Sequence, residues 1–380
     1  MLYSSPEIGE AEMAVIARIA ELRQKLRYVI REPKCWVGSL RRLSFARNLQ
    51  NSNNIEGFNS TLDDAAAVVV GEEPQGVDEE TRAALEGCRE AMTYIFQRVE
   101  DEDFSCSIDF IKSLHFMITN YSIQNRPGRW REGAIYVTSP TSGEIIHTGV
   151  DIDEVPALMD ELVGYVNTTA DELLVRAALF QLNLTMIHPF RAGNGRMARC
   201  LQSFVLANGG LCSPIFLSIE EYLGQHIQDY YNVLQEVGRG SWRPAMDTLP
   251  WIRFYLTAHL RQTATLHRRA KEAERLWMDM ELLVGSRPDR QLIALNDAAM
   301  GLRIRRAIFM RFAQEAGEEV SEQTAGRDLK ALVDDGLLES KGEKRGRYYE
   351  ASDKVAAVWR AITQTRDPLE TADPFQLVRD

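Results

Sequence analysis

The sequence predicts a mainly α-helical protein, with a helical core that carries one β-hairpin and a small helix-turn-helix domain near the C-terminus. Three observations support this prediction. Apolar residues recur at helical spacing along most of the 380 residues. Two short strand-like runs, 134–137 and 144–147, flank a turn-rich segment in the middle of the chain. Near the C-terminus, two helical patterns are followed by two further strand-like runs.

A chain of this length is expected to form about two to three domains. The periodic patterns divide it into five parts. They are an N-terminal helical region at 1–104, a central core at 105–245, a helical connector at 246–288, a C-terminal domain at 289–360 and a tail at 361–380.

Composition narrows the class of protein. The 44 basic against 55 acidic residues argue against a nucleic-acid surface over the whole chain, although a local basic patch is compatible with them. No signal peptide and no apolar run long enough for a membrane span are evident, so no membrane partner is expected. The cysteines are scattered and form no C-x-x-C pair, which favours a reduced, cytoplasmic protein. They are Cys35, Cys88, Cys106, Cys200 and Cys212.

Residues 1–34 have the pattern of one long helix that ends near Pro33. The next helix runs into an asparagine-rich stretch that contains Ser52, Glu56 and Gly57. By propensity this stretch is a helix end with Gly57 as its left-handed cap, exposed as an ordinary surface turn. Further helices are expected within 60–103 and 108–126, where they pack on the core.

The strand-like runs 134–137 and 144–147 predict a β-hairpin with a loop at 139–143. His147 on this hairpin is expected to face solvent. A helix at 153–167 leads into the central one, in which Leu174, Ala178, Leu182 and Met186 recur every four residues. Apolar residues fill its other faces too, so it should be the buried axis of the core.

Residues 188–199 follow this buried helix. Pro189 disfavours helical geometry at His188, so the helix should end there and place the imidazole at the mouth of a loop. Gly193 and Gly195 can turn backbone N–H groups inward, and the helix that starts next adds its unpaired amides and dipole. Arg196 and Arg199 lie three residues apart and can reach the same side. A histidine, an amide nest and two guanidiniums suit general-base chemistry on a phosphate ester.

These twelve residues resemble the signature H-P-F-x-[D/E]-G-N-G-R-x-x-R of the Fic (filamentation induced by cAMP) family. The resemblance implies a helical Fic core that transfers AMP from ATP to a Ser, Thr or Tyr hydroxyl of a target protein. By position, it gives His188 as the general base and Phe190 as the anchor of the loop. It also implies a set of nucleotide-binding residues: Gly193, Asn194 and Gly195 around the α- and β-phosphates, Arg196 at the developing charge and Arg199 at the γ-phosphate.

Ala192 departs from the signature, because Fic proteins usually carry an acid there that holds Mg²⁺. A methyl group cannot ligate this cation, which prefers oxygen ligands. Mg²⁺ is expected to accompany ATP, but its protein ligand is missing. Either phosphates, water and another carboxylate hold the metal, or activity is weak or altered.

Beside a Fic core, residues 52–57 resemble the family's inhibitory motif [S/T]-x-x-x-E-[G/N]. In that arrangement Glu56 would pair bidentately with Arg199 and occupy the place of the γ-phosphate. Ser52 would support the glutamate loop or cap the helix. Two further segments resemble family features: Arg126–Arg131 precedes the hairpin, and the hairpin resembles the flap that pairs with a target strand. An ordinary structural hairpin is the alternative.

The helix expected at 216–237 contains Tyr230 and Tyr231 in a string that resembles the family's "Y-Y-x-x-L" helix. A tyrosine there lies near the adenosine in the family, and plain core packing is the alternative. The pattern from Trp242 to about Met280 is a long helix that we interpret as the connector.

The C-terminal domain has helical patterns at 304–316 and 320–338, with Ser321 as an N-cap and Gly336 at the helix end. The runs 337–339 and 347–350 flank a basic turn, and the whole resembles a winged helix. Basic residues that could contact DNA phosphates are Lys330, Lys341, Lys344, Arg345 and Arg347. Protein recognition or support of a homodimer is the alternative.

Two other functions remain open at this stage. One is a nucleotide-binding, winged-helix DNA-binding regulator with an inactive Fic core, which Ala192 favours. The other is a transferase of the same fold that moves a different phosphate-linked group.

Overall fold

The computed structural model describes residues 1–31, 35–138, 143–210, 214–315, 317–343 and 346–376. Within these ranges the chain is mainly helical, and its short strands form two separate hairpins. The first elements are α1 (Glu10–Arg31), α2 (Cys35–Asn54), α3 (Leu62–Val69), α4 (Glu79–Arg98), α5 (Ile108–Thr119) and a 3₁₀ turn at Ile123–Asn125. The central ones are β1 (Tyr136–Thr138), β2 (Ile145–Thr148), a 3₁₀ turn at Ile152–Glu154, α6 (Val155–Thr168), α7 (Leu173–Ile187), α8 (Asn194–Asn208), a 3₁₀ turn at Pro214–Phe216, α9 (Glu220–Gln225) and α10 (Ile227–Gly238). The last ones are α11 (Leu249–Val284), α12 (Asp289–Ala299), α13 (Arg306–Glu315), α14 (Glu322–Asp334), β3 (Leu338–Lys341), β4 (Tyr348–Ala351) and α15 (Asp353–Gln364).

Several features expected from the sequence lie outside the described residues. They are Pro33, Cys212, the hairpin-loop residues 139–142, and Lys344 and Arg345 of the basic turn. The described cysteines Cys35, Cys88, Cys106 and Cys200 are free thiols, and Cys200 is buried. Within the same ranges, no helix is long and apolar enough to cross a membrane.

Helix α7 is the axis of the main core, as its all-round apolar pattern predicts. Twelve of its 15 residues are buried, and α6, α8 and α11 pack around it. Trp251 of α11 is fully buried and donates its indole N–H to the Ala178 carbonyl of α7 at 2.8 Å. The packing around α7 therefore fixes the position of its C-terminal end, where the loop begins.

The prediction of one helix over 1–34 is wrong for the first nine residues, which precede α1 in a non-helical conformation. The backbone N–H of Tyr3 donates to Asn183 Oδ1 of α7, and the Tyr3 carbonyl accepts from Asn183 Nδ2. The Tyr3 side chain is buried as well. Tertiary contacts with α7 thus replace the helical hydrogen bonds that local periodicity favours.

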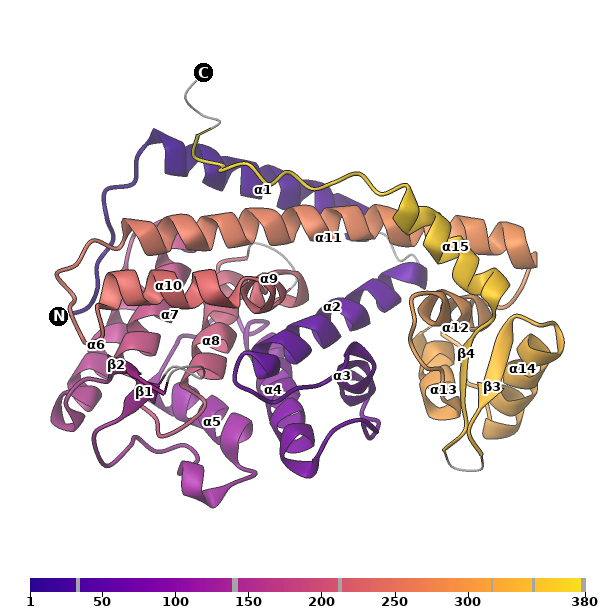
Figure 1. Cartoon of the computed structure of the whole chain (residues 1–380), viewed down its shortest axis with the longest axis horizontal. Coiled ribbons are helices and arrows are strands. Elements are labelled where there is room, and N and C mark those ends of the chain that lie inside the picture. Colours follow the sequence, from indigo (N-terminus) through magenta and orange to yellow (C-terminus); the bar gives the residue numbers. More distant parts are fainter. Residues whose placement is uncertain (32–34, 139–142, 211–213, 316, 344–345, 377–380) are drawn as a thin grey trace.

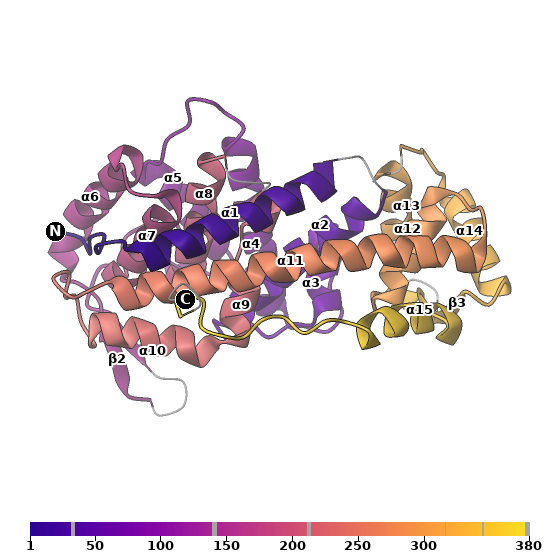
Figure 2. The ribbon, with the colours of Figure 1, turned by 90° about the horizontal axis from the view of Figure 1, so that it is seen from above.

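Helix α11 runs along the length of the molecule, from the main core to the C-terminal domain (Figures 1 and 2). Helix α1 packs beside it. Buried residues of α11 belong to three apolar clusters in turn, for example Leu256, Leu266 and Leu276. The helix that the sequence indicates as a connector is therefore also part of every core that it links.

The C-terminal domain consists of α12, α13, α14 and α15 around the hairpin β3–β4. Ser321 caps α14, since its hydroxyl accepts from the Thr324 N–H, and Gly336 follows the helix with φ +63°, both as predicted. Ile304 pairs with Tyr349 and extends the hairpin by one bridge. Helix α15 continues to Gln364, so the boundary expected at 360 falls inside a helix.

Helix α2 connects the main core with the C-terminal domain. Near its middle, the Arg42 guanidinium pairs with Asp297 of α12 at 2.9 Å and lies over the Phe312 ring of α13. At its C-terminal end, α2 leads into residues 55–57. The same helix thus contacts the C-terminal domain and positions the turn that holds Glu56.

Candidate active site

The loop between α7 and α8 has the predicted backbone at His188 and Gly193, whereas Gly195 lies inside α8 and does not take a positive φ. Helix α7 ends at Ile187, and His188 takes the left-handed conformation with φ 54° and ψ 59°. Gly193 precedes α8 with φ +76°, which favours glycine. The Asn194 side chain closes the loop, because it accepts from the Phe190 N–H at 2.9 Å and donates to the Phe190 carbonyl at 2.8 Å. Phe190 itself is fully buried and anchors the loop, as expected.

Two further residues fix this loop, and sequence reasoning did not assign them a role. The buried His115 stacks on Phe190 and donates through Nε2 to the Ala192 carbonyl at 3.1 Å. The buried Arg131 donates to the carbonyls of His188 and Val150. Arg131 lies in the segment that was noted for its resemblance, whereas His115 gave no sequence signal apart from its place on a helix.

His188 is held as a neutral base. Its Nδ1 lies 3.1 Å from the Thr185 carbonyl, which can only accept, so Nδ1 carries the hydrogen and Nε2 presents a lone pair. Burial lowers the pKa of His188 to about 4, against the opposing effect of the Thr185 carbonyl. The side chain nevertheless lines a cavity of about 500 Å³, where a substrate hydroxyl could reach it.

His147 does not face solvent, contrary to the expectation from the hairpin pattern. Its Nε2 donates to the Met186 carbonyl at 2.8 Å, and its ring lies 6.4 Å from that of His188. β2 passes beside the end of α7, and this packing turns the side chain inward. Burial lowers the pKa of His147, so it adds no positive charge beside His188 at neutral pH.

Arg199 of α8 is bound to the turn after α2. Its Nε donates to Ser52 Oγ at 3.0 Å, while its Nη2 donates to the Ser52 carbonyl and to Glu56 Oε1, each at 2.8 Å. The expected pair is therefore present, but it is not bidentate. Only one carboxylate oxygen accepts from Arg199, and Ser52 accepts from the same guanidinium through its hydroxyl and its carbonyl. Gly57 has φ +91°, as expected for the left-handed position after a helix.

The Glu56 carboxylate lies over the start of α8. A Cβ placed on Gly195 would collide with Glu56 Oε1, so any other residue here would push the carboxylate aside. Burial alone would raise the pKa of Glu56, but the charges of Arg199 and Arg196 outweigh it and lower this pKa. The carboxylate is thus ionised, and it lines the cavity beside the loop.

Arg196 does not line the cavity, so the two arginines do not share one side as expected. Its guanidinium is buried and lies over the Phe58 ring, with Nη2 donating to the Tyr121 hydroxyl at 3.1 Å. Nε and Nη1 of Arg196 have no hydrogen-bond partner among the described residues. These two donors leave Arg196 able to bind an anion after a small movement.

The two tyrosines of α10 lie in different environments. Tyr230 is fully buried, with its ring near those of Trp251 and Phe254. Tyr231 is partly exposed, lines the cavity and donates to the Ile55 carbonyl at 3.3 Å. Both tyrosines line the cavity, and Tyr230 is at the same time packed in the core, so its expected core packing is confirmed.

The comparisons with known proteins agree with this geometry. Residues 105–206 match the model of the Fic/DOC family. The chain is 26% identical over 260 residues to "Protein adenylyltransferase Fic" of Nematostella vectensis, which covers 63% of this chain and 54% of that protein. It is 30% identical over 145 residues to "Protein adenylyltransferase fic-1" of Caenorhabditis briggsae, covering 38% of this chain and 26% of that protein. The chain thus spans about half or less of the length of these relatives.

Solved structures show the same fold. A Fic family protein from Desulfovibrio desulfuricans G20 has a TM-score of 0.59 at 21% identity, covering 93% of this chain and 98% of that one. Fic-1 of C. elegans has a TM-score of 0.54 at 19% identity, covering 69% and 72%. Residues 105–206 form a Fic/DOC domain. The loop 188–199 lies inside this Fic domain, whereas Ser52–Gly57 and the C-terminal domain lie outside it.

The Fic loop does not fit a protein-held Mg²⁺. At the usual acid position, Ala192 offers only its backbone carbonyl, which already accepts from His115. The nearby Glu56 is paired with Arg199. Within the described ranges, no group of three or more His, Cys, Asp or Glu residues could hold a metal ion.

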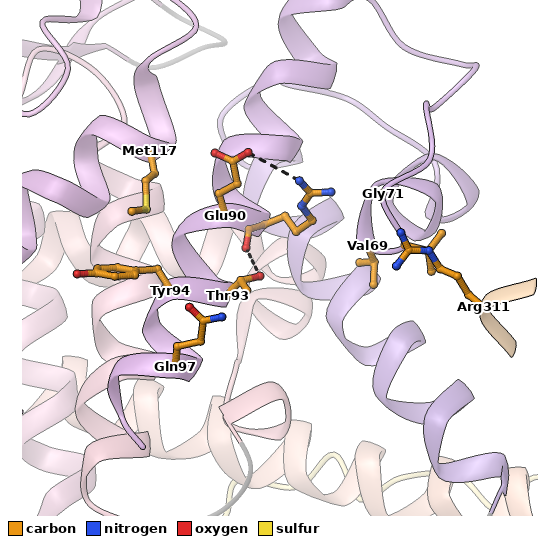
Figure 3. A pocket seen from close by; sticks show the side chains of 10 residues that line it. Val69, Gly71, Glu90, Thr93, Tyr94, Gln97, Met117 and Arg311 are labelled. Carbon is orange, nitrogen blue, oxygen red and sulfur yellow. Dashed lines mark hydrogen bonds and ion pairs between the residues drawn. The ribbon is translucent and has the colours of Figure 1, made fainter. Parts of the chain in front are cut away.

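A second cavity of about 500 Å³ lies away from the Fic loop, between α3, α4, α5 and α13 (Figure 3). It contains Arg89 and Arg311, but Arg89 already donates to the Val68 carbonyl and lies 3.7 Å from Glu90. None of the loop residues 188–199 lines this cavity. Size therefore does not distinguish the two cavities, and the candidate active site is the one that His188 and Arg199 line.

Proposed function

We propose that this chain is an ATP-dependent protein adenylyltransferase, which transfers AMP to a Ser, Thr or Tyr hydroxyl of a target protein. The observation that carries the proposal is a neutral His188 whose Nε2 can accept a proton beside an anion-binding loop. The names of the relatives, which are protein adenylyltransferases, support the same activity.

In the proposed reaction, His188 Nε2 takes the proton of the target hydroxyl. The hydroxyl oxygen then bonds to the α-phosphorus of ATP, the bond from this phosphorus to the bridging oxygen breaks, and pyrophosphate leaves. The amides of Gly193, Asn194 and Gly195 at the start of α8 would hold the α- and β-phosphates. Arg196, with two unused donors, would stabilise the developing charge.

We propose that Glu56 inhibits the enzyme by holding Arg199. In this proposal Arg199 binds the γ-phosphate only after Glu56 leaves it, and Ser52 keeps the guanidinium in place. Gly57 lets the chain turn so that the carboxylate reaches the loop. Mg²⁺ that enters with ATP would be held by phosphates and water, since Ala192 provides no carboxylate.

Tyr231 at the cavity wall is proposed to lie beside the adenosine. The hairpin β1–β2 is proposed to bind the target as an added strand. Tyr136 and Ile145 on this hairpin are more than half exposed and offer apolar contacts for it. The free thiols suit a cytoplasmic location.

The C-terminal domain is proposed to be a winged helix, which its order of helices and hairpin supports. Its partner is DNA, another protein or a second copy of this chain. Lys330 and Lys341 are paired with Asp334 and Glu339, which weakens a basic DNA-binding surface. Arg347 is exposed.

The experiment compares ATP labelled at the α-phosphate with ATP labelled at the γ-phosphate. Adenylyl transfer labels protein from the α-position only, whereas transfer of the terminal phosphate labels it from the γ-position. A nucleotide-binding regulator, the second candidate that Ala192 favours, would bind ATP and yield no label from either position. That last result would overturn the proposed activity.

A further inference from the structure

Helix α2 also lines a smaller cavity of about 230 Å³ between α2, α11 and α15. Leu43, Met300 and Trp359 form apolar parts of its wall. Arg47, Arg269 and Arg366 bring guanidiniums to it from α2, α11 and the segment just after α15. Parts of the chain that are more than 200 residues apart thus place three positive groups around one small space.

Two of these arginines are already paired. Arg269 donates through Nη1 and Nη2 to Glu221 at 2.6 and 2.7 Å. Arg366 donates through Nε and Nη2 to Glu272 at 2.7 and 2.9 Å. Each bidentate pair holds its guanidinium at the cavity. The pair has no net charge, because one arginine is matched by one glutamate.

Arg47 makes neither a hydrogen bond nor an ion pair through its side chain with any described residue. It is partly buried, so water compensates its charge less well than at the surface. Burial, together with the charges of Arg269 and Arg366, lowers the pKa of Arg47 to about 10. The charge of Glu221 opposes this shift but does not cancel it. The cavity therefore holds a surplus of positive charge.

We propose that this cavity binds a small organic phosphate, a phosphomonoester whose phosphate group pairs with Arg47 and whose apolar part packs on Trp359. A phosphomonoester carries about −1.5 to −2 charge at pH 7 and three acceptor oxygens. The planar guanidinium of arginine can pair with two of these oxygens at once, which the single ammonium group of lysine cannot do in the same way. The cavity is smaller than the roughly 300–1,000 Å³ that suit drug-sized ligands, which limits the ligand to a compact molecule. This site is separate from the proposed ATP site, and its existence does not depend on adenylyl transfer.

The test is isothermal titration of the full chain with phenyl phosphate at constant ionic strength. Phenyl phosphate should bind the wild type, and the uncharged phenol should not. Arg47→Gln should weaken binding by at least tenfold, while Arg47→Lys, which keeps the charge, should lose only a few-fold. Arg41→Gln is the matched control, since Arg41 is exposed on the same helix and does not line the cavity. Trp359→Leu should weaken binding of phenyl phosphate but not that of inorganic phosphate.

Equal affinity in the wild type and Arg47→Gln would overturn the proposal. Binding that survives Arg47→Gln but is lost in Arg199→Gln would also overturn it, since the probe would then occupy the Fic loop. The thermal midpoint of Arg47→Gln without ligand should equal or exceed that of the wild type, because the change removes a charge that burial and two neighbouring arginines destabilise. A clearly lower midpoint would show that Arg47 is structural and would contradict the proposal.

Discussion

Arg199 and Arg47 are both largely buried arginines next to helix α2, and they differ in how their charges are compensated. The Arg199 side chain is 1% exposed and has three hydrogen bonds, to Ser52 and Glu56. Arg47 has no polar partner among the described residues. A buried guanidinium is stable when it is paired and costly when it is not. The protein thus contains one arginine, Arg199, whose charge is paired with a carboxylate of the same chain. It contains another, Arg47, that has no such partner.

Removing the proposed base, His188, should produce the largest change in labelling. It should also distinguish the loop that contains His188 from the cavity that contains Arg47. His188→Ala is expected to lower labelling from α-labelled ATP by about 100- to 10,000-fold, the usual contribution of a general base. Binding of phenyl phosphate at the Arg47 cavity should remain unchanged. Autoradiography and titration measure the two quantities. Full transfer by the variant would show that His188 is not the base.

An acid at position 192 should raise the labelling rate by roughly 100-fold, if a protein-held metal ion lowers the activation barrier by a few kcal/mol. Ala192→Asp should therefore raise the labelling rate and make it depend more steeply on Mg²⁺. Ala192→Asn, of similar size but uncharged, is the control. An unchanged rate would mean that another carboxylate already serves, or that the chemistry is not adenylylation.

Removing the Glu56 carboxylate should leave Arg199 with the uncharged hydroxyl and carbonyl of Ser52 as partners, and its charge free for a phosphate. Glu56→Gly is expected to increase labelling by about 5- to 150-fold, the range of typical coupling between sites. The effect should be clearest in the Ala192→Asp background, and Arg199→Ala should abolish it. Glu102→Gly, at an exposed turn, is the matched control. No increase in either background would reject the inhibitory role of Glu56.

The two arginines should also differ in what they contribute to folding. Arg199→Ala leaves Ser52 and Glu56 without their donor and should lower the free energy of unfolding by about 1–3 kcal/mol. The loss stays modest because the Glu56 side chain is 27% exposed and can regain water. Arg47→Gln should leave this free energy unchanged or raise it, because it removes an unpaired, partly buried charge. Urea denaturation measures both, and equal losses would contradict the comparison.

The smallest effect is expected from pH. For a histidine with the ordinary pKa of about 6.5, the neutral fraction would fall about tenfold as the pH is lowered from 8 to 5.5. Burial lowers the pKa of His188 to about 4, so it gains a proton only as the pH falls through that value. Transfer should therefore change by less than about twofold over this range. Burial raises the pKa of Glu220, near Arg199, to about 7, and Glu220→Gln removes this second titration. A tenfold loss in Glu220→Gln would contradict a neutral, buried His188.

Much of the candidate site could be predicted from local sequence. Pro189 predicts that α7 ends before it, and Gly193 predicts the turn into α8, because both residues restrict or permit backbone angles by themselves. The family resemblance places Glu56 against Arg199, and the structure contains this contact. The roles of these residues in catalysis and inhibition stay predictions.

Other features depend on contacts between distant segments, which no local pattern contains. Ser52 accepts from Nε and Nη2 of Arg199, and the pair with Glu56 uses a single carboxylate oxygen. The end of α7 turns His147 inward, and His115 and Arg131 hold the loop from other elements.

By itself, the sequence of this protein determined where α7 ends and α8 begins and which residues form the loop between them. The reason is that capping, proline and glycine act within a few residues of the chain. The sequence did not show that the helix expected at 216–237 is divided into α9 and α10. Only the tertiary structure decided which guanidiniums are paired. Arg47 lies on a helix face like many other arginines, and its isolation follows from Arg269 and Arg366, which reach it from distant segments with carboxylates of their own.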